Sequence, residues 1–136
     1  MTLTQLQTES IELSNLICKL AGHPPIHLVF KGVKSYEGKA FLPGIKNGEG
    51  YISIANGLSS SNKYYREAIV IHEVCHFLYY RWYNSKGRTF KADHHGIGFK
   101  RIETYWLKEF GMYPLYAKAY WHTLLSVSGD ILWSKE

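Results

Sequence analysis

The chain opens with apolar residues at helical spacing, which predict an N-terminal helix over residues 4–21. Thr2 or Thr4 can cap its first turn, and Gly22 followed by two prolines ends it. We expect this to be a covering helix that packs through one apolar side. That side is predicted to consist of Leu6, Leu13, Leu16, Ile17 and Leu20.

Three short, largely apolar runs follow this helix and predict strands. They cover residues 26–30, 39–42 and 51–54, and stretches rich in Gly, Pro and Asn separate them. Strands of this length are not stable as an isolated sheet of three, so we expect them to pack against helices.

The longest apolar segment, residues 66–83, contains the pattern His-Glu-x-x-His, and the polar run at 59–62 offers N-cap residues for a helix there. Residues four apart lie above one another on a helix, so His72 and His76 present two imidazoles to one point, with Glu73 rotated by about 100°. Such a pair can hold zinc, and Glu73 can then hydrogen-bond a metal-bound water without ligating the metal. Burying these three polar residues without partners would be costly, which favours a metal site over ordinary core histidines.

A second amphipathic helix follows a polar loop, with apolar residues from Phe99 to Phe110 at three- and four-residue steps and Gly111 just after its end. A weaker pattern predicts a third helix from Pro114 and a short apolar tail. Together these elements predict one α+β domain over residues 1–136. It consists of an N-terminal helix, a small three-stranded sheet, the active-site helix, a second helix that carries or follows the third ligand, and an extra C-terminal helix.

A catalytic zinc ion binds three protein ligands and leaves one position for water. Extending the apolar stripe of the second helix toward its N-terminus leads to His95, if helical geometry already holds there. His95 is therefore the predicted third ligand, which with His72 and His76 would hold one Zn²⁺ ion. His94 and Glu103 are the alternatives, although Glu103 lies off the apolar stripe and is expected at the surface.

The predicted reaction is metal-assisted peptide hydrolysis. Glu73 is the expected catalytic residue, which takes a proton from the attacking water and delivers one to the leaving amine. Cys75 is expected to be a small buried hydrophobe, since its position next to His76 does not let it easily reach the same ion. By residue type alone, the candidates for stabilising the oxyanion are Tyr113, Tyr116, His94 and His122.

With 136 residues, of which 46% are hydrophobic, the chain can bury a core without disulfides. Cys18 and Cys75 form no Cys-x-x-Cys pair, which argues against a disulfide framework and a zinc ribbon. No segment approaches the roughly 20 apolar residues of a membrane span, and the first residues lack the layout of a signal peptide. We therefore expect a cytoplasmic protein without a membrane partner.

The net charge of +5 is concentrated around the metal motif, since residues 61–110 contain nine Lys and Arg against five Asp and Glu. Basic surfaces attract phosphates, which makes this segment a candidate for nucleic-acid binding, while a solvated loop would explain the same charges. The candidate nucleic-acid-binding residues are Arg81, Lys86, Arg88, Lys91, Lys100 and Arg101.

The chain resembles the SprT-like, Spartan-type zinc metalloproteases in its motif residues. These are His-Glu-Val-Cys-His at 72–76 and His-Gly-Ile-Gly-Phe at 95–99, which matches the family's His-Gly-x-x-Phe element with its third zinc ligand. Residues 52–58 resemble the strand and turn before the active-site helix. The resemblance implies a zincin-like fold, one zinc ion, Glu73 as catalytic acid and base, and His95 rather than His94 as ligand.

The resemblance also implies a substrate class, because Spartan-type members cleave proteins crosslinked to DNA and need DNA nearby. We therefore expect protein substrates that include DNA-bound ones, single-stranded or junction DNA as a partner, and in that case a nucleoid or nuclear location. Trp82, Tyr83 and Phe90 could stack on unpaired bases. The chain departs from many relatives because it contains no cysteine-rich zinc ribbon and has a longer loop between His76 and His95.

In zincins, the strand at the edge of the cleft pairs with an extended substrate, and by resemblance we assign this role to residues 51–54. An alternative function is a nucleic-acid-binding module in which zinc only holds the fold. A binding module has no use for Glu73 beside the metal, and the sequence offers no obvious fourth ligand to close the site. These two features favour the enzyme.

Overall fold

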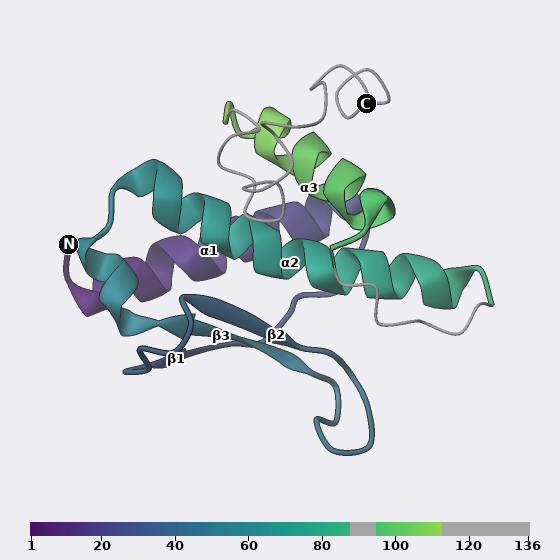
Figure 1. The fold of residues 1–136 in the computed structure, drawn as a ribbon, viewed down its shortest axis with the longest axis horizontal. Helices are drawn as coiled ribbons and strands as arrows, with labels where there is room; N and C mark the ends of the chain where they lie inside the picture. The colour runs from purple at the N-terminus through teal and green to yellow at the C-terminus, as the bar shows by residue number, and fades with distance from the viewer. Residues whose placement is uncertain (88–94, 113–136) are drawn as a thin grey trace.

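The computed structural model describes residues 1–87 and 95–112, which confirm the predicted α+β class. The helices lie on one face of a mixed sheet, with α2 between the sheet and α3 (Figure 1). The predicted helix from Pro114 and the tail after it lie outside the described residues. In chain order the elements are α1 (Leu3–Ala21), β1 (Leu28–Lys31), β2 (Gly38–Phe41), β3 (Tyr51–Ala55), the short 3₁₀ helix η1 (Asn56–Ser60), α2 (Lys63–Ser85) and α3 (Ile97–Glu109).

β3 is the central strand of the sheet, whose order is β1-β3-β2. β1 runs parallel to β3, and β2 runs antiparallel to it. Side chains alternate along a strand, so Ile52 and Ile54 point to the same face, where both are fully buried in the core. Among the described residues, the outer edge of β2 has no partner strand.

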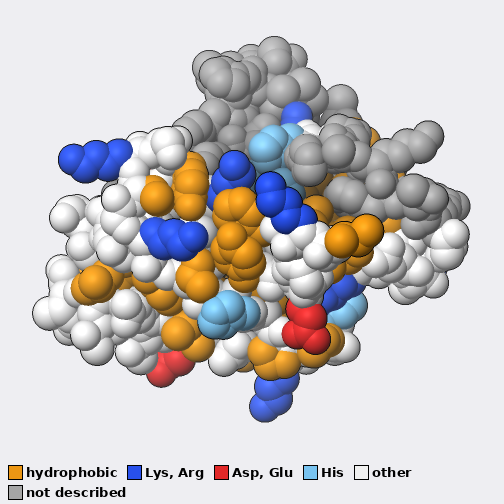
Figure 2. Space-filling model, turned by 90° about the horizontal axis from the view of Figure 1, so that it is seen from below, with side chains coloured by type: hydrophobic (Ala, Val, Ile, Leu, Met, Phe, Trp, Pro, Cys, Tyr) orange, Lys and Arg blue, Asp and Glu red, His pale blue; other side chains and the backbone are white. Residues whose placement is uncertain are grey.

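The other face of the sheet is covered by its own aromatic side chains. The rings of Phe41 and Tyr51 stack at 4.6 Å between centroids. The ammonium groups of Lys39 and Lys31 lie over these rings, Lys39 over Phe41 and Lys31 over Tyr51. Figure 2 views the molecule from this side and shows hydrophobic side chains with lysine and arginine among them. Stacked rings thus shield the face of the sheet that the helices leave uncovered.

The N-terminal helix α1 begins as predicted but buries a different side. Thr2 and Gln5 form a capping box, in which each side chain accepts a hydrogen bond from the backbone N–H of the other residue. The prediction that Leu16 and Leu20 face the core is wrong, because they are 44% and 61% exposed. Ser10 and Ser14 are buried on α1 instead, and the helix packs against α2. The buried residues of α1 are Leu6, Ser10, Ser14, Ile17 and Cys18.

The central helix α2 is enclosed by the rest of the molecule. Its N-cap is Asn62, whose side chain accepts a hydrogen bond from the N–H of Tyr65. Every residue from Ala68 to Tyr79 is buried, because α1, the sheet and α3 pack around this helix. Although α2 is long, no helix in the described part of the chain is both long and apolar enough to cross a membrane.

The helix α3 follows the predicted third ligand, which is one of the two arrangements expected from the sequence. Gly96 is its N-cap and Ile97 its first residue, so His95 lies in the turn before the helix. The predicted end is confirmed, because Gly111 has a φ of 73° and follows the last helical turn. Its N–H and that of the next residue donate to carbonyls of the final turn, which is the pattern of a Schellman motif.

Candidate metal centre

Three histidines converge where α3 packs against α2. His72 and His76 lie one turn apart on α2, and His95 reaches them from the turn before α3. One ligand atom from each of the three lies within 4.8 Å of the other two. The Nε2 atoms of His72 and His95 are 3.2 Å apart. These predicted ligands are therefore close enough to bind one metal ion together.

The donor set fits a transition metal. Neutral imidazole is a ligand for zinc, copper, iron and nickel, and three imidazoles leave a position open for water or substrate. His72 and His76 are 2% and 7% exposed, whereas His95 is exposed at the rim. The site is thus closed on the α2 side and accessible from the side of His95.

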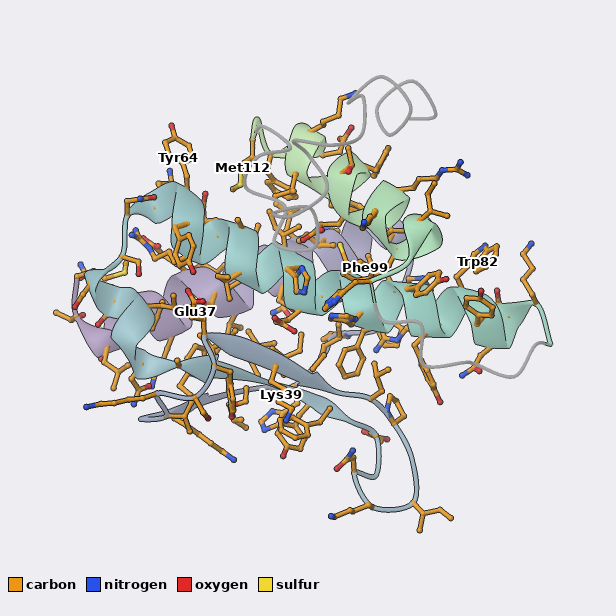
Figure 3. The ribbon with its side chains drawn as sticks, viewed as in Figure 1. Glu37, Lys39, Tyr64, Trp82, Phe99 and Met112 are labelled. Atoms are coloured by element: carbon orange, nitrogen blue, oxygen red, sulfur yellow. The ribbon has the colours of Figure 1, made fainter. Side chains whose placement is uncertain are left out.

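The ring of Phe99 contacts all three imidazoles. It stacks on His76 with a centroid distance of 4.4 Å, and it meets His72 and His95 at 5.1 and 5.4 Å with steeply inclined rings. Phe99 is fully buried and lies at the start of α3, beside α2 (Figure 3). It forms an apolar wall that restricts the orientations of the three rings.

Gly98 lets α3 approach α2 closely at this point. A Cβ atom at Gly98 would lie 2.9 Å from the hydroxyl oxygen of Tyr79 and 3.1 Å from its Cε1 atom. Tyr79 is buried, and its hydroxyl donates a hydrogen bond to that of Tyr83. The glycine therefore makes room for Tyr79 between the helices, which keeps His95 within reach of the histidines of α2.

Glu103 is not the surface residue that the sequence predicts. Its side chain is 0% exposed, and its Oε2 atom lies 2.6 Å from Nδ1 of His72. It contacts a predicted ligand and does not belong to the group of possible ligands itself. The stripe through Ile102 misplaces the buried side of α3, which runs instead through Phe99, Glu103 and Trp106. Their spacing of four and three residues is the signal that could have identified Glu103.

Cys75 is fully buried, as predicted, and lies close to two carboxylates. Burial raises the pKa of the Cys75 thiol well above its usual value, and the charges of Glu103 and Glu73 raise it further. A thiolate here would meet two negative charges in the interior. Cys75 is therefore a neutral packing residue.

A cleft of about 360 Å³ opens beside the three histidines. One wall is α2, which contributes Glu73, and the opposite wall is β2 and the residue after it. Glu73 lines this cleft although it is only 3% exposed. A Cβ atom at Gly38 would lie 2.9 Å from Cγ of Glu73, so the backbone of Gly38 rests directly on that side chain. The β2 side of the cleft consists of Gly38, Lys39, Ala40 and Leu42.

The strand predicted to edge the cleft is the wrong one. β3 lies between β1 and β2, so its backbone groups pair on both sides, whereas β2 is an edge strand of the described sheet and lines the cleft. The N–H of Ala55 donates to the carbonyl of Glu37, so these two residues face each other as a hydrogen-bonded pair. Along antiparallel strands, hydrogen-bonded pairs alternate with pairs that are not hydrogen-bonded, and Gly38 and Ala40 belong to the second kind. The backbone N–H and C=O groups of Gly38 and Ala40 therefore point away from β3.

Arg81, a predicted nucleic-acid contact, is engaged within the protein. Its Nη1 donates to the carbonyl of Pro24 at 2.9 Å, and its guanidinium group lies over the ring of Phe77. This arginine connects the C-terminal half of α2 to the segment before β1.

The other described candidates for nucleic-acid binding lie just after α2 and in the first half of α3. Lys86 is exposed after the last turn of α2, four residues beyond Trp82, whose exposed ring lies toward the C-terminal end of that helix (Figure 3). Lys100 and Arg101 lie in the first half of α3, and Arg101 is exposed. The remaining candidates for DNA and oxyanion contacts lie outside the described residues. They are Arg88, Phe90, Lys91, His94, Tyr113, Tyr116 and His122.

Comparison with known proteins gives no match: no family model, no curated protein and no solved structure matches this chain. The resemblance to SprT-like metalloproteases thus rests on the motif residues at 72–76 and 95–99 and on the segment at 52–58.

Proposed function

We propose that this protein is a zinc-dependent endopeptidase of the SprT-like type with a zincin-like fold. The observation that carries the proposal is the convergence of His72, His76 and His95 beside Glu73 in a cleft bordered by an edge strand. Zinc is favoured because three histidines and one open position form a known catalytic zinc arrangement. The motif resemblance supports the same assignment.

Glu73 is the proposed catalytic residue. It follows His72 on α2 and lines the same cleft as the three histidines. Zinc, when bound, supplies a Lewis acid that polarises the scissile carbonyl and lowers the pKa of water. Glu73 accepts the proton of the attacking water and delivers a proton to the leaving amine. The backbone of Gly38, which rests on Glu73, holds its carboxylate at the cleft wall.

The edge strand β2 is the proposed docking strand for the substrate. The outward backbone groups of Gly38 and Ala40 can pair with an extended peptide, which would add a fourth strand to the sheet. Main-chain pairing does not depend on side chains, so it supports broad sequence tolerance. Ala40 and Leu42 give the cleft a small apolar wall against which substrate side chains can pack.

We propose that the substrates include DNA-bound proteins. Trp82 is 43% exposed on α2, Lys86 is exposed just after the end of α2, and Arg101 is exposed on α3. Exposed aromatic rings stack on unpaired bases, and basic side chains neutralise phosphates. Single-stranded or junction DNA is therefore the expected partner, and it would recruit the enzyme to its substrates.

The deciding experiment measures the cleavage of a histone by zinc-loaded protein, with and without single-stranded DNA. Glu73→Gln should keep the zinc content of the wild type and lose cleavage by about 100-fold or more, because proton transfer is lost. Glu67→Gln is the matched control, since Glu67 lies on the same helix and outside the cleft. It should cleave like the wild type.

The same experiment decides between the enzyme and the binding module. Cleavage by the wild type and by Glu67→Gln, but not by Glu73→Gln, supports the peptidase, and a requirement for DNA supports the proposed substrate class. If no variant cleaves while all bind single-stranded DNA with an affinity that falls steeply with salt, the protein is a nucleic-acid-binding module with a structural zinc.

A further inference from the structure

We infer that Glu103 is a positioning residue of the metal centre, whose carboxylate accepts a hydrogen bond from Nδ1–H of His72 and thereby leaves Nε2 of His72 to bind the metal. This inference rests on the proposed zinc site and adds to it a residue outside the ligand set. Glu103 comes from α3, whereas the ligand that it contacts comes from α2.

The contact has the geometry of a charge-assisted hydrogen bond. Nδ1 of His72 and Oε2 of Glu103 are 2.6 Å apart, which is shorter than a typical neutral N–H···O bond, and the two side chains are 3% and 0% exposed. A neutral imidazole carries one proton, so a proton held at Nδ1 leaves a lone pair on Nε2. Nε2 is the atom of His72 that faces His95 at 3.2 Å. The carboxylate therefore selects the tautomer that the metal site needs.

Burial of Glu103 is difficult to explain by stability alone. Its Oε1 atom is buried and has no hydrogen-bond partner among the described residues, so within this part of the chain its carboxylate is only half satisfied. Burying a charge in this way usually destabilises a protein compared with an apolar side chain of similar size. Glu73 is a second buried carboxylate in the same region. Two carboxylates would balance the charge of one divalent cation held by three neutral imidazoles, which gives both of them a reason to be buried.

Glu103 also links the two parts of the site mechanically. The turn before α3 supplies His95, and one to two turns into the same helix Glu103 contacts His72. Phe99 lies between these two positions and packs against all three imidazoles. A shift of α3 along α2 would therefore disturb the third ligand and the hydrogen bond to His72 together.

The test compares Glu103→Gln and Glu103→Leu with the wild type in two measurements that do not depend on activity. The first is zinc affinity by competition with a chromogenic chelator, and the second is thermal unfolding of the metal-free protein. Both variants should bind zinc about 10- to 100-fold more weakly, as is typical when a carboxylate that orients a ligand is removed. Metal-free Glu103→Leu should melt at the same temperature as the wild type or higher, because an unsatisfied buried charge is gone. Glu109→Gln, an exposed glutamate on the same helix, is the matched control and should leave both quantities unchanged.

A purely structural role gives the opposite pattern. Metal-free Glu103→Leu would then lose stability, while the folded variants would bind zinc as tightly as the wild type, and this result would overturn the inference. Nuclear magnetic resonance of the zinc-loaded protein gives an independent signature. A slowly exchanging Nδ1–H resonance of His72 is expected in the wild type and should shift or disappear in Glu103→Leu.

The outcomes separate this inference from the proposed function. If the wild type binds no zinc, the metal centre fails and the role of Glu103 fails with it. If the wild type and Glu103→Gln bind zinc equally, and the Nδ1–H resonance of His72 is unchanged in Glu103→Leu, only the role of Glu103 is refuted. The zinc site then stands.

Discussion

Among single residues, the buried polar ones distinguish this molecule from an ordinary small domain. His72, Glu73 and Glu103 are 2%, 3% and 0% exposed within a core of apolar side chains. A core built only for stability would exclude such groups, because burial of polar and charged atoms without full compensation is costly. Their presence on two facing helices therefore points to chemistry at this contact.

Gly38 offers a test of how tightly β2 packs on Glu73. In Gly38→Ala the new Cβ would lie 2.9 Å from Cγ of Glu73 and from Cγ2 of Ile69, so the strand or the side chain must move. We expect a loss of about 1–3 kcal/mol in the free energy of unfolding, as for other overpacked sites, and weaker peptide cleavage with unchanged zinc affinity. Urea unfolding and cleavage assays measure these effects. Gly57→Ala is the control, since a Cβ there meets nothing within 4 Å, and an equal effect in both variants would contradict the prediction.

We expect Phe99 to contribute both to the stability of the fold and to the affinity of the site for zinc. Phe99→Leu keeps an apolar side chain but loses the flat ring that stacks on His76 and contacts the other two imidazoles. We expect a modest loss of stability, about 1–2 kcal/mol, together with weaker zinc binding, because the histidine rings gain freedom. Calorimetric titration with zinc measures the second effect. Tyr105→Leu changes an exposed aromatic residue on the same helix, so zinc binding as weak as that of Phe99→Leu would refute the specific role of Phe99.

At the scale of elements, the sequence pattern predicts the helices and their ends, whereas it does not predict how the elements are arranged in the tertiary structure. The spacing of His72 and His76 and the capping residues Thr2 and Gly111 follow from helix geometry, which the sequence carries directly. The strand order does not follow from any periodicity, so the prediction that β3 lies at the edge of the sheet is wrong, and this strand is central. Leu20 and Glu103 show the same limit, because the buried side of a helix depends on which neighbour packs against it.

The edge strand β2 gives a prediction about substrate binding. Because the N–H of Ala40 points away from β3, Ala40→Pro removes a group that can pair with a substrate and no hydrogen bond of the sheet. We expect kcat/KM for protein substrates to fall about 10-fold, the equivalent of one lost hydrogen bond, while zinc affinity stays the same. Steady-state cleavage assays and chelator competition measure the two quantities. Full activity in a folded Ala40→Pro variant would exclude main-chain pairing at this position.

On the scale of the whole molecule, the proposed metal connects elements that are separate in the sequence. His72 and His76 belong to α2, and His95 follows 19 residues after His76, beyond the end of that helix. The contact between α2 and α3 depends on Phe99, Glu103 and the close approach at Gly98. A metal ion held by all three histidines would therefore act as a cross-link between the two helices.

Zinc should accordingly stabilise the whole fold, and we expect this stabilisation to depend on His95. A ligand that binds only the folded state raises the free energy of unfolding by about 4.1 kcal/mol at 1,000 times its Kd, which thermal unfolding with zinc and with a chelator will measure. In His95→Ala the two histidines of α2 remain, but the ligand next to α3 is lost. Zinc should therefore raise the melting temperature of this variant much less than that of the wild type. Because His95 is exposed, this substitution should leave the metal-free protein folded. If zinc stabilises His95→Ala as strongly as the wild type, the third ligand is another residue and the two helices are not cross-linked through the metal.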